Sequence, residues 1–383
     1  MTVLDPLNSI YTRRKTTPVK CGEVTIGGVY PISIQTMTRS DTRDIQSTVA
    51  EIRAATDAGA DIVRVAVLDK EAAEAISAIS KQVVCPIVAD IHFDYRLAIS
   101  ALKNGAHKVR VNPGNIGGSD KLLAVALKAK ETGAAIRVGV NSGSVPKDIL
   151  ARYGSPTPEA IVETAKRSLV FLEDNGATGI VISLKSSRVP DTVQSYALMA
   201  PQTEWPFHVG ITEAGPGTTG VIKSTAGIAS LLTIGLGDTV RASLTGPLLD
   251  EVRTAQDILQ AIGVASFGPD VISCPTCGRT QVDLVPVARE ISEKVRGLKI
   301  PMKIAVMGCP VNGPGEAKEA DVGLACGRDG GVLFSRGIVV GSVRSEDMVS
   351  GLMSLILAEA KKRGKTGGSS LHLDHGGSLN EQR

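Results

Sequence analysis

Three cysteines in the C-terminal third of the chain have the spacing of ligands for a metal ion or an iron–sulfur cluster. Cys274 and Cys277 stand in a Cys-Pro-Thr-Cys turn, and Cys309 opens a Cys-Pro-Val-Asn-Gly-Pro-Gly-Glu segment that ends at Glu316. A close cysteine pair with a distant third is typical of such sites, and the prolines tighten both turns. A cluster held by three thiolates leaves one iron with a weak, exchangeable ligand. This pattern therefore favours a catalytic cluster over an electron carrier.

A structural zinc site is the alternative interpretation, with Cys326 as the fourth thiolate. Zinc ribbons usually carry a second close pair, whereas Cys309 and Cys326 stand apart in the sequence. Disulfide bonds are not expected, because six cysteines in 383 residues without a secretory signal indicate a reducing cytosol. Cys21 and Cys85 are interpreted as ordinary buried thiols.

Composition restricts the classes of partner. The net charge is +3 and aromatic residues make up only 3% of the chain, with no stretch in which aromatic and basic residues alternate. Nucleic acid is therefore not an expected partner. No apolar run approaches the roughly 20 residues of a membrane span, so we expect no membrane contact and a cytoplasmic protein.

Hydrophobic patterning predicts an α/β fold. From about residue 30, short Val- and Ile-rich runs alternate with Ala-rich amphipathic segments such as 44–58, 120–132 and 158–174. Eight such units in series predict an eight-stranded parallel βα barrel of the TIM type. The expected strands are 32–36, 61–66, 86–91, 107–111, 135–140, 179–184, 207–212 and 238–243.

The pattern changes after a closing helix over about 249–262, which ends at Gly263. Residues 1–263 are thus predicted to form the barrel, which binds substrate. Residues 264–363 show a mixed order of strands and helices and are predicted to form a small α+β iron–sulfur domain. The Gly- and Ser-rich segment 364–383 is predicted to be a disordered tail.

Polar residues gather where the expected barrel strands end, which is where such barrels place their active sites. Arg110 and Asn112, like Arg241 and Ser243, are two residues apart and so share one face of a strand, which we assign to the interior. The set comprises Arg64, Asp90, His92, Arg110, Asn112, Arg137, Asn141, Lys185, Glu213, Arg241 and Ser243.

The set includes five cations, which would repel one another inside a closed barrel without a bound anion. Arginine forks match phosphate oxygens, and lysine adds a point charge. We therefore expect a small diphosphate substrate; for any single arginine, an ion pair with an acidic neighbour is the alternative. A Gly-Pro-Gly-Thr-Thr-Gly loop over 215–220 matches a dinucleotide-binding pattern, but the acidic residue expected at the end of the next strand is absent. We therefore reject a dinucleotide site, and interpret the loop as part of a barrel phosphate site.

These motifs resemble those of the 4-hydroxy-3-methylbut-2-enyl diphosphate synthase family of the non-mevalonate isoprenoid pathway, in its two-domain bacterial form. The resemblance covers roughly residues 10–362. It rests on Asp-Ile-His-Phe-Asp-Tyr at 90–95, Val-Arg-Val-Asn-Pro-Gly-Asn-Ile-Gly at 109–117, Arg-Val-Gly-Val-Asn-Ser-Gly-Ser at 137–144, Gly-Ile-Thr-Glu-Ala-Gly at 210–215 and the arrangement from Cys274 to Glu316.

The resemblance implies a reductive dehydroxylation and ring opening of 2-C-methyl-D-erythritol 2,4-cyclodiphosphate. It implies a 4Fe-4S cluster held by Cys274, Cys277 and Cys309, with Glu316 as the fourth ligand, and a flavodoxin or ferredoxin as electron donor. Glu213 is expected to donate a proton to the departing water, or else to pair with a nearby cation. The substrate ligands implied are Arg64, Arg110, Asn112, Arg137, Asn141, Lys185 and Ser243, with Asp90 and His92 helping to position the substrate.

Two other functions stay open at this point, a redox-silent barrel transferase or lyase with structural zinc and a metal-bearing scaffold module. We also expect a head-to-tail homodimer, in which the cluster domain of one chain caps the barrel of the other. The last barrel helix delivers the chain to the end opposite the strand termini. A linker of about six residues reaches only about 20 Å, which a helix of about 13 residues already covers.

Overall fold

The computed structural model describes residues 12–309 and 319–366. The chain divides into two compact units, Met1–Ala265 and Ser266–Arg383. None of the helices in the described ranges is long and apolar enough to cross a membrane.

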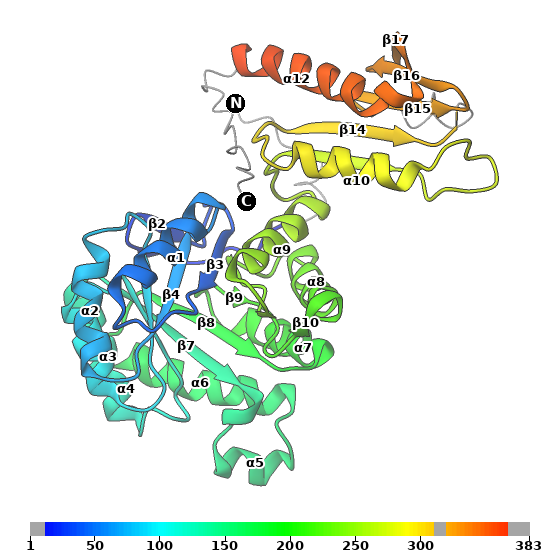
Figure 1. Ribbon diagram of the computed structural model, residues 1–383. Helices are drawn as coiled ribbons and strands as arrows, with labels where there is room; N and C mark the ends of the chain where they lie inside the picture. The colour runs from blue at the N-terminus through cyan, green and yellow to red at the C-terminus, as the bar shows by residue number, and fades with distance from the viewer. Residues whose placement is uncertain (1–11, 310–318, 367–383) are drawn as a thin grey trace. The chain divides into compact units, whose positions relative to one another are not determined.

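The first unit is the predicted barrel. Its eight strands run parallel in the order β8-β7-β6-β5-β4-β3-β11-β9. A bridge between Ile182 and Phe207 joins the two ends of this sheet and closes the ring. Figure 1 shows the strands surrounded by helices. The strands are β3 (Ser33–Met37), β4 (Ile62–Ala66), β5 (Ile87–Asp90), β6 (Lys108–Val111), β7 (Ala135–Asn141), β8 (Ile180–Lys185), β9 (His208–Val209) and β11 (Thr239–Val240).

The last two barrel strands are much shorter than the predicted 207–212 and 238–243. Beyond them the chain forms a separate parallel pair, β10 (Gly215–Pro216) with β12 (Leu244–Thr245). The barrel helices are α1 (Ile45–Asp57), α2 (Lys70–Ser80), α3 (Tyr95–Lys103), α4 (Ser119–Thr132), α6 (Pro158–Asp174), α7 (Val189–Met199), α8 (Gly217–Thr233) and α9 (Leu248–Ala261).

Local sequence explains where these helices begin. Before α6, the Thr157 side chain accepts a hydrogen bond from the Ala160 N–H, and Pro158 occupies the first helical position. A short 3-10 turn, Ser142–Ser144, and helix α5 (Lys147–Tyr153) were not predicted and lie between β7 and α6.

A hairpin closes the end of the barrel at which the strands begin. It consists of β1 (Val19–Cys21) and β2 (Val24–Ile26), which pair in an antiparallel manner. Val19, Cys21 and Ile26 form one buried cluster with the first interior side chains of four barrel strands, which are Ile62, Val88, Ala135 and Val181. This floor was not predicted. The expectation that Cys21 and Cys85 are buried thiols is confirmed.

The second unit has the predicted α+β fold. Its sheet follows the order β13-β14-β15-β16-β17, parallel between the first three strands and antiparallel thereafter. One face of the sheet packs against α10 and α12 through side chains such as Ile304, Leu324 and Leu352. The elements are β13 (Pro269–Ser273), α10 (Leu284–Val295), β14 (Met302–Met307), β15 (Val322–Gly327), β16 (Gly330–Ser335), β17 (Ile338–Arg344) and α12 (Met348–Thr366).

Helix α12 extends past residue 363, so the first residues assigned to a tail are helical. The periodic pattern of this helix continues into Lys361 and Lys362, and Gly364 does not end it. The rest of the predicted tail lies outside the described residues.

Candidate functional site

Five cationic side chains lie buried on the interior face of the barrel. Arg64 follows Ile62 by two residues and Arg137 follows Ala135 by two, and both apolar residues contact the hairpin floor. Because side chains alternate along a strand, the two arginines also face inward. Exposed fractions are 8% or less for all five, Arg64, Arg110, Arg137, Lys185 and Arg241. The structure thus brings the predicted cations together.

Asp90 is a buried carboxylate that lies among these cations. Its Oδ1 lies 3.3 Å from Nη1 of Arg110 and 3.8 Å from Nη1 of Arg64, and its Oδ2 lies 3.4 Å from Nε2 of His92. Burial alone would raise the pKa of Asp90. Arg64, the hydrogen bond from His92 and Arg110 outweigh that effect and hold the pKa well below its usual range. Asp90 is therefore ionised and offsets part of the cationic charge.

Arg137 and Lys185 occupy the most cationic surroundings. Burial, followed by repulsion from Arg64 and Arg110, lowers the pKa of Arg137. Its Nε and Nη1 have no hydrogen-bond partner within the described ranges. Burial, followed by repulsion from Arg137 and Arg241, lowers the pKa of Lys185 well below that of a free lysine. A bound anion with several oxygens would satisfy these donors and reverse the repulsion.

Arg241 forms the kind of ion pair that the sequence left open as an alternative. Its Nη2 lies 3.2 Å from Oε1 of Glu251, a residue of α9 that is 1% exposed. Arg39, at the C-terminal end of β3, binds the same carboxylate oxygen at 2.9 Å. Burial is the main cause that lowers the pKa of Arg241, to about 10.

Two asparagines shape the loops next to these cations. Asn112 is buried, and its Oδ1 accepts a hydrogen bond of 3.1 Å from the Gly114 N–H. A Cβ at Gly114 would lie 2.2 Å from the Ser144 carbonyl oxygen, so only glycine fits there. Asn141 ends β7, and its N–H donates to Ser144 Oγ at 3.2 Å. The two loops that carry Asn112 and Asn141 are therefore held against each other.

The remaining predicted residues lie nearer the surface. Glu213 is exposed and has a φ of 51°, a left-handed conformation that is uncommon for glutamate. It stands just before β10, and Ser243 just before β12, the partner strand of β10. The side chain of His92 is 53% exposed. The structure thus places Glu213 and Ser243 on neighbouring segments at one end of the barrel, and His92 near Asp90.

Sequence reasoning missed a group of polar residues on the same interior face. Gln35, Lys108 and His208 are 1% exposed or less, and their terminal nitrogen and oxygen atoms have no hydrogen-bond partner in the part of the chain described. Lys108 precedes Arg110 by two residues in β6, so the same alternation that placed Arg110 on the interior face also predicts an interior position for Lys108. Glu251 and Arg39 were also missed, because an acid in the first turn of a helix is common for reasons of helix stability alone.

The second unit brings the cysteine turns close together. Parallel pairing of β13 with β14 places Cys274 and Cys309, each just beyond its strand, at the same edge of the sheet. The Gly308 N–H donates a hydrogen bond of 3.3 Å to Cys274 Sγ. Thr276, between Cys274 and Cys277, has a φ of 54°. Thiols that follow neighbouring strands at one sheet edge suit a soft metal centre.

Hydrogen bonding favours the thiolate form in this turn. The backbone N–H and then the side chain of Arg279 lower the pKa of the Cys277 thiol. Among the described residues, no three Cys, His, Asp or Glu side chains are already grouped closely enough to hold a metal ion. Glu316, the predicted fourth ligand, lies outside the described residues.

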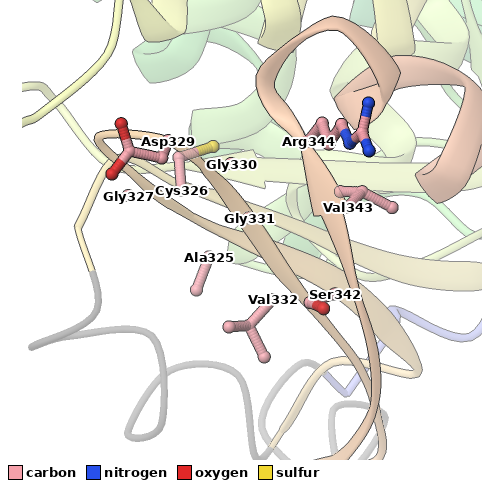
Figure 2. A pocket seen from close by; sticks show the side chains of 10 residues that line it. All are labelled: Ala325, Cys326, Gly327, Asp329, Gly330, Gly331, Val332, Ser342, Val343 and Arg344. Carbon is pink, nitrogen blue, oxygen red and sulfur yellow. The ribbon is translucent and has the colours of Figure 1, made fainter.

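A pocket of about 550 Å³ opens on strands β15 to β17. Figure 2 shows the residues that line it, which include Cys326, Asp329 and Arg344. Its lining includes none of the predicted barrel residues or cluster ligands. Cys326, the fourth thiolate of the zinc alternative, belongs to the hydrophobic core on the helix-covered face of the sheet.

Family models match both units of the chain. The GcpE TIM-barrel domain matches residues 16–256, and the GcpE protein C-terminal domain matches residues 270–358. The chain belongs to the GcpE family. The family resemblance predicted from the sequence motifs is confirmed.

Curated relatives of this GcpE chain align over nearly their whole length. The protein of Clostridium perfringens is 48% identical over 344 residues, 90% of this chain and 99% of that protein. The protein of Caldanaerobacter subterraneus subsp. tengcongensis is 50% identical over 347 residues, 91% of this chain and 98% of that protein. Both are named 4-hydroxy-3-methylbut-2-en-1-yl diphosphate synthase (flavodoxin).

Proposed function

We propose that this chain is a 4-hydroxy-3-methylbut-2-en-1-yl diphosphate synthase. It opens the ring of 2-C-methyl-D-erythritol 2,4-cyclodiphosphate and removes one hydroxyl group as water, with the uptake of two electrons and two protons. The observation that carries the proposal is the group of five buried cations inside the barrel, only partly offset by Asp90 and Glu251. Such an excess of buried positive charge suits a diphosphate.

The barrel residues bind and orient the substrate. Arg64, Arg110, Arg137, Lys185 and Arg241 hold the diphosphate, and Asn112, Asn141 and Ser243 add neutral hydrogen bonds. Asp90 and His92 orient the neighbouring guanidinium groups and the sugar-derived carbon chain. Glu213, exposed just before β10, gives its proton to the leaving hydroxyl group.

The second unit would hold a 4Fe-4S cluster through Cys274, Cys277 and Cys309, with Glu316 as the fourth ligand. When bound, this cluster supplies electrons to the substrate. A carboxylate is a harder and more labile ligand than thiolate, so Glu316 leaves its position more readily than a cysteine. The relatives' name supports flavodoxin as the electron donor.

The active unit is a head-to-tail homodimer in which each barrel is capped by the partner's cluster domain. Helix α9 ends at Ala261 and β13 begins at Pro269, so the linker reaches roughly 25 Å at most. Helix α9 alone, with 14 residues, spans about 21 Å, so only about 4 Å of that reach would remain for the linker to turn around the barrel rim. To test this, Glu213→Gln and Cys309→Ser chains are refolded together. Mixed dimers with one intact site should restore roughly a quarter of wild-type activity on random pairing, whereas sites built within one chain restore none.

Metal content separates this function from the zinc-bearing alternatives, which the relatives do not favour. Anaerobically purified protein should be brown and contain about four irons per chain. Colourless protein with one zinc would contradict the proposal.

Two variants test the roles within the site. Glu316→Cys should retain the cluster but lose nearly all turnover, because a fourth thiolate is not readily displaced.

Arg110→Ala should keep the brown colour and weaken substrate binding roughly ten- to a hundredfold, as expected for one charged hydrogen bond. Unchanged substrate affinity in Arg110→Ala would place the diphosphate elsewhere.

A further inference from the structure

Glu251 is a buried carboxylate that was not among the predicted site residues. Four different groups donate hydrogen bonds to it. Its Oε2 accepts from Thr36 Oγ1 at 2.9 Å, and its Oε1 accepts from Arg39 Nη2 at 2.9 Å. Nη2 of Arg241 lies 3.2 Å from Oε1 and 3.3 Å from Oε2, and the Leu244 N–H donates to Oε1 at 3.1 Å. The residue lies in the first turn of α9 and is 1% exposed.

These contacts hold one segment of the barrel mouth at both of its ends. Arg241 and Leu244 flank Ser243, and Arg241 and Ser243 are the two proposed diphosphate ligands of this segment. Besides the bond from the Leu244 N–H to Glu251, the Leu244 carbonyl oxygen accepts from Arg39 Nη2 at 3.1 Å. The backbone N–H and the carbonyl oxygen of Leu244 are therefore both fixed by the Glu251–Arg39 pair.

The contact with Glu251 also determines which part of Arg241 remains free. Its Nη2 is engaged, whereas its Nε is buried and has no hydrogen-bond partner within the described ranges. A buried N–H without a partner is costly. A guanidinium held at one nitrogen can offer another to an anion without searching rotamers.

We propose that Glu251 is a positioning residue for diphosphate binding, which fixes the guanidinium group of Arg241 directly and the position of Ser243 through Leu244. This rests on the proposed function, in which Arg241 and Ser243 contact the diphosphate. Glu251 itself does not touch the substrate. Glutamine at this position has nearly the same shape but no charge, and its amide NH₂ would face the guanidinium groups of Arg39 and Arg241. The guanidinium group of Arg241 would then no longer be held in place.

The chain contains a matched control for this carboxylate. Asp238 is also 1% exposed, and it stands at the opposite end of β11 from Arg241. It accepts from Arg13 Nη2 at 2.5 Å, from Thr16 Oγ1 at 3.3 Å and from the Phe207 N–H at 2.7 Å. Both carboxylates thus bind an arginine, a threonine hydroxyl and a backbone N–H, but only Glu251 binds a proposed substrate ligand.

The test measures anion affinity by calorimetry on anaerobic holoprotein, with the cyclodiphosphate and with inorganic diphosphate as probes. Glu251→Gln should raise Kd roughly ten- to a hundredfold, and Glu251→Asp, which keeps the charge with a shorter reach, should raise it less. Asp238→Asn should lower the melting temperature but change Kd by less than about threefold, within the usual range for a distant site. If Glu251→Gln does not fold, Glu251→Asp decides the question against the same control.

A double-mutant cycle shows whether Glu251 acts through Arg241. In an Arg241→Ala background, most of the Kd penalty of Glu251→Gln should disappear. An undiminished penalty, or a penalty no larger than that of Asp238→Asn, overturns the positioning role. Wild-type protein that binds inorganic diphosphate but not the cyclodiphosphate overturns the proposed function alone, and the cycle is then judged on inorganic diphosphate. Wild-type protein that binds neither probe overturns both.

Discussion

Oδ1 of Asp90 lies 3.3 Å from Nη1 of Arg110, and the two residues are 5% and 6% exposed. A buried ion pair of this kind adds little stability as a whole, but the loss of one partner leaves an unpaired buried charge. Without Asp90, Arg110 would be one of several buried cations with fewer anionic neighbours, so this carboxylate matters more for stability than the pair with Arg110 alone suggests.

Asp90→Asn should therefore lower the free energy of unfolding at pH 7, by about 3 kcal/mol. The folded-state pKa of Asp90 is lowered, so its contribution is fully present above the unfolded pKa of about 3.9 and is lost as the pH falls through the folded value. Urea titrations should show the difference from wild type shrinking below about pH 4. Asp57→Asn, at an exposed position of α1, is the control. A constant difference across this pH range would contradict the prediction.

Lys185 should take up a proton when diphosphate binds. Burial and repulsion from Arg137 and Arg241 lower its pKa in the free protein, and a bound anion raises it again. Calorimetry in buffers of different ionisation enthalpy should show uptake of up to one proton, and affinity should fall as pH rises. Lys185→Met removes this uptake and gives the baseline for protonation of the diphosphate itself. Equal uptake in both proteins would show that Lys185 is already charged.

Lys108→Met should stabilise the protein. The Nζ atom is fully buried without a hydrogen-bond partner in the described part of the chain, and burial is the main cause that lowers its pKa to about 8. Between about pH 8 and 10.5 the unfolded chain binds more protons, so wild-type stability rises with pH over this window. The variant should lack that rise and gain about 1 to 3 kcal/mol at pH 7.

The matched control for this substitution is Lys103→Met, at an exposed position of α3. Thermal melts from pH 6 to 10 compare the three proteins. A loss of stability in Lys108→Met would mean that the ammonium group binds water or an anion that outweighs its burial.

Gly210→Ala should disturb the cationic site through its backbone. An added Cβ would lie 2.3 Å from the Arg241 carbonyl oxygen and 3.1 Å from Lys185 Nζ, so both segments must move. We expect about 2 kcal/mol of lost stability and at least a tenfold loss of diphosphate affinity, measured by melting and calorimetry. Gly143→Ala, where an added Cβ has no atom within 4 Å, should change neither. Normal affinity in Gly210→Ala would exclude close packing of these segments around the ligand.

Much of the barrel could be predicted from the sequence because its strands are buried on both faces. Runs such as Ile62–Ala66 stand out against Ala-rich helices, and the alternation of Arg110 with Asn112 identified the interior face. The hairpin floor could not be found in this way, since three-residue strands such as Val19–Cys21 show too little periodicity. Glu251 was equally hidden, because its partners Thr36 and Arg39 are distant from it in sequence and only the closed ring brings them together.

The hairpin floor has a consequence for the order in which the chain folds. Val19, Cys21 and Ile26 lie near the beginning of the sequence, but their partners extend to Val181 in β8. The early residues therefore cannot bury their side chains until most of the barrel has been synthesised and arranged. Contacts of such long sequence separation slow folding, so we expect the hairpin to become native only after β8 has joined the ring.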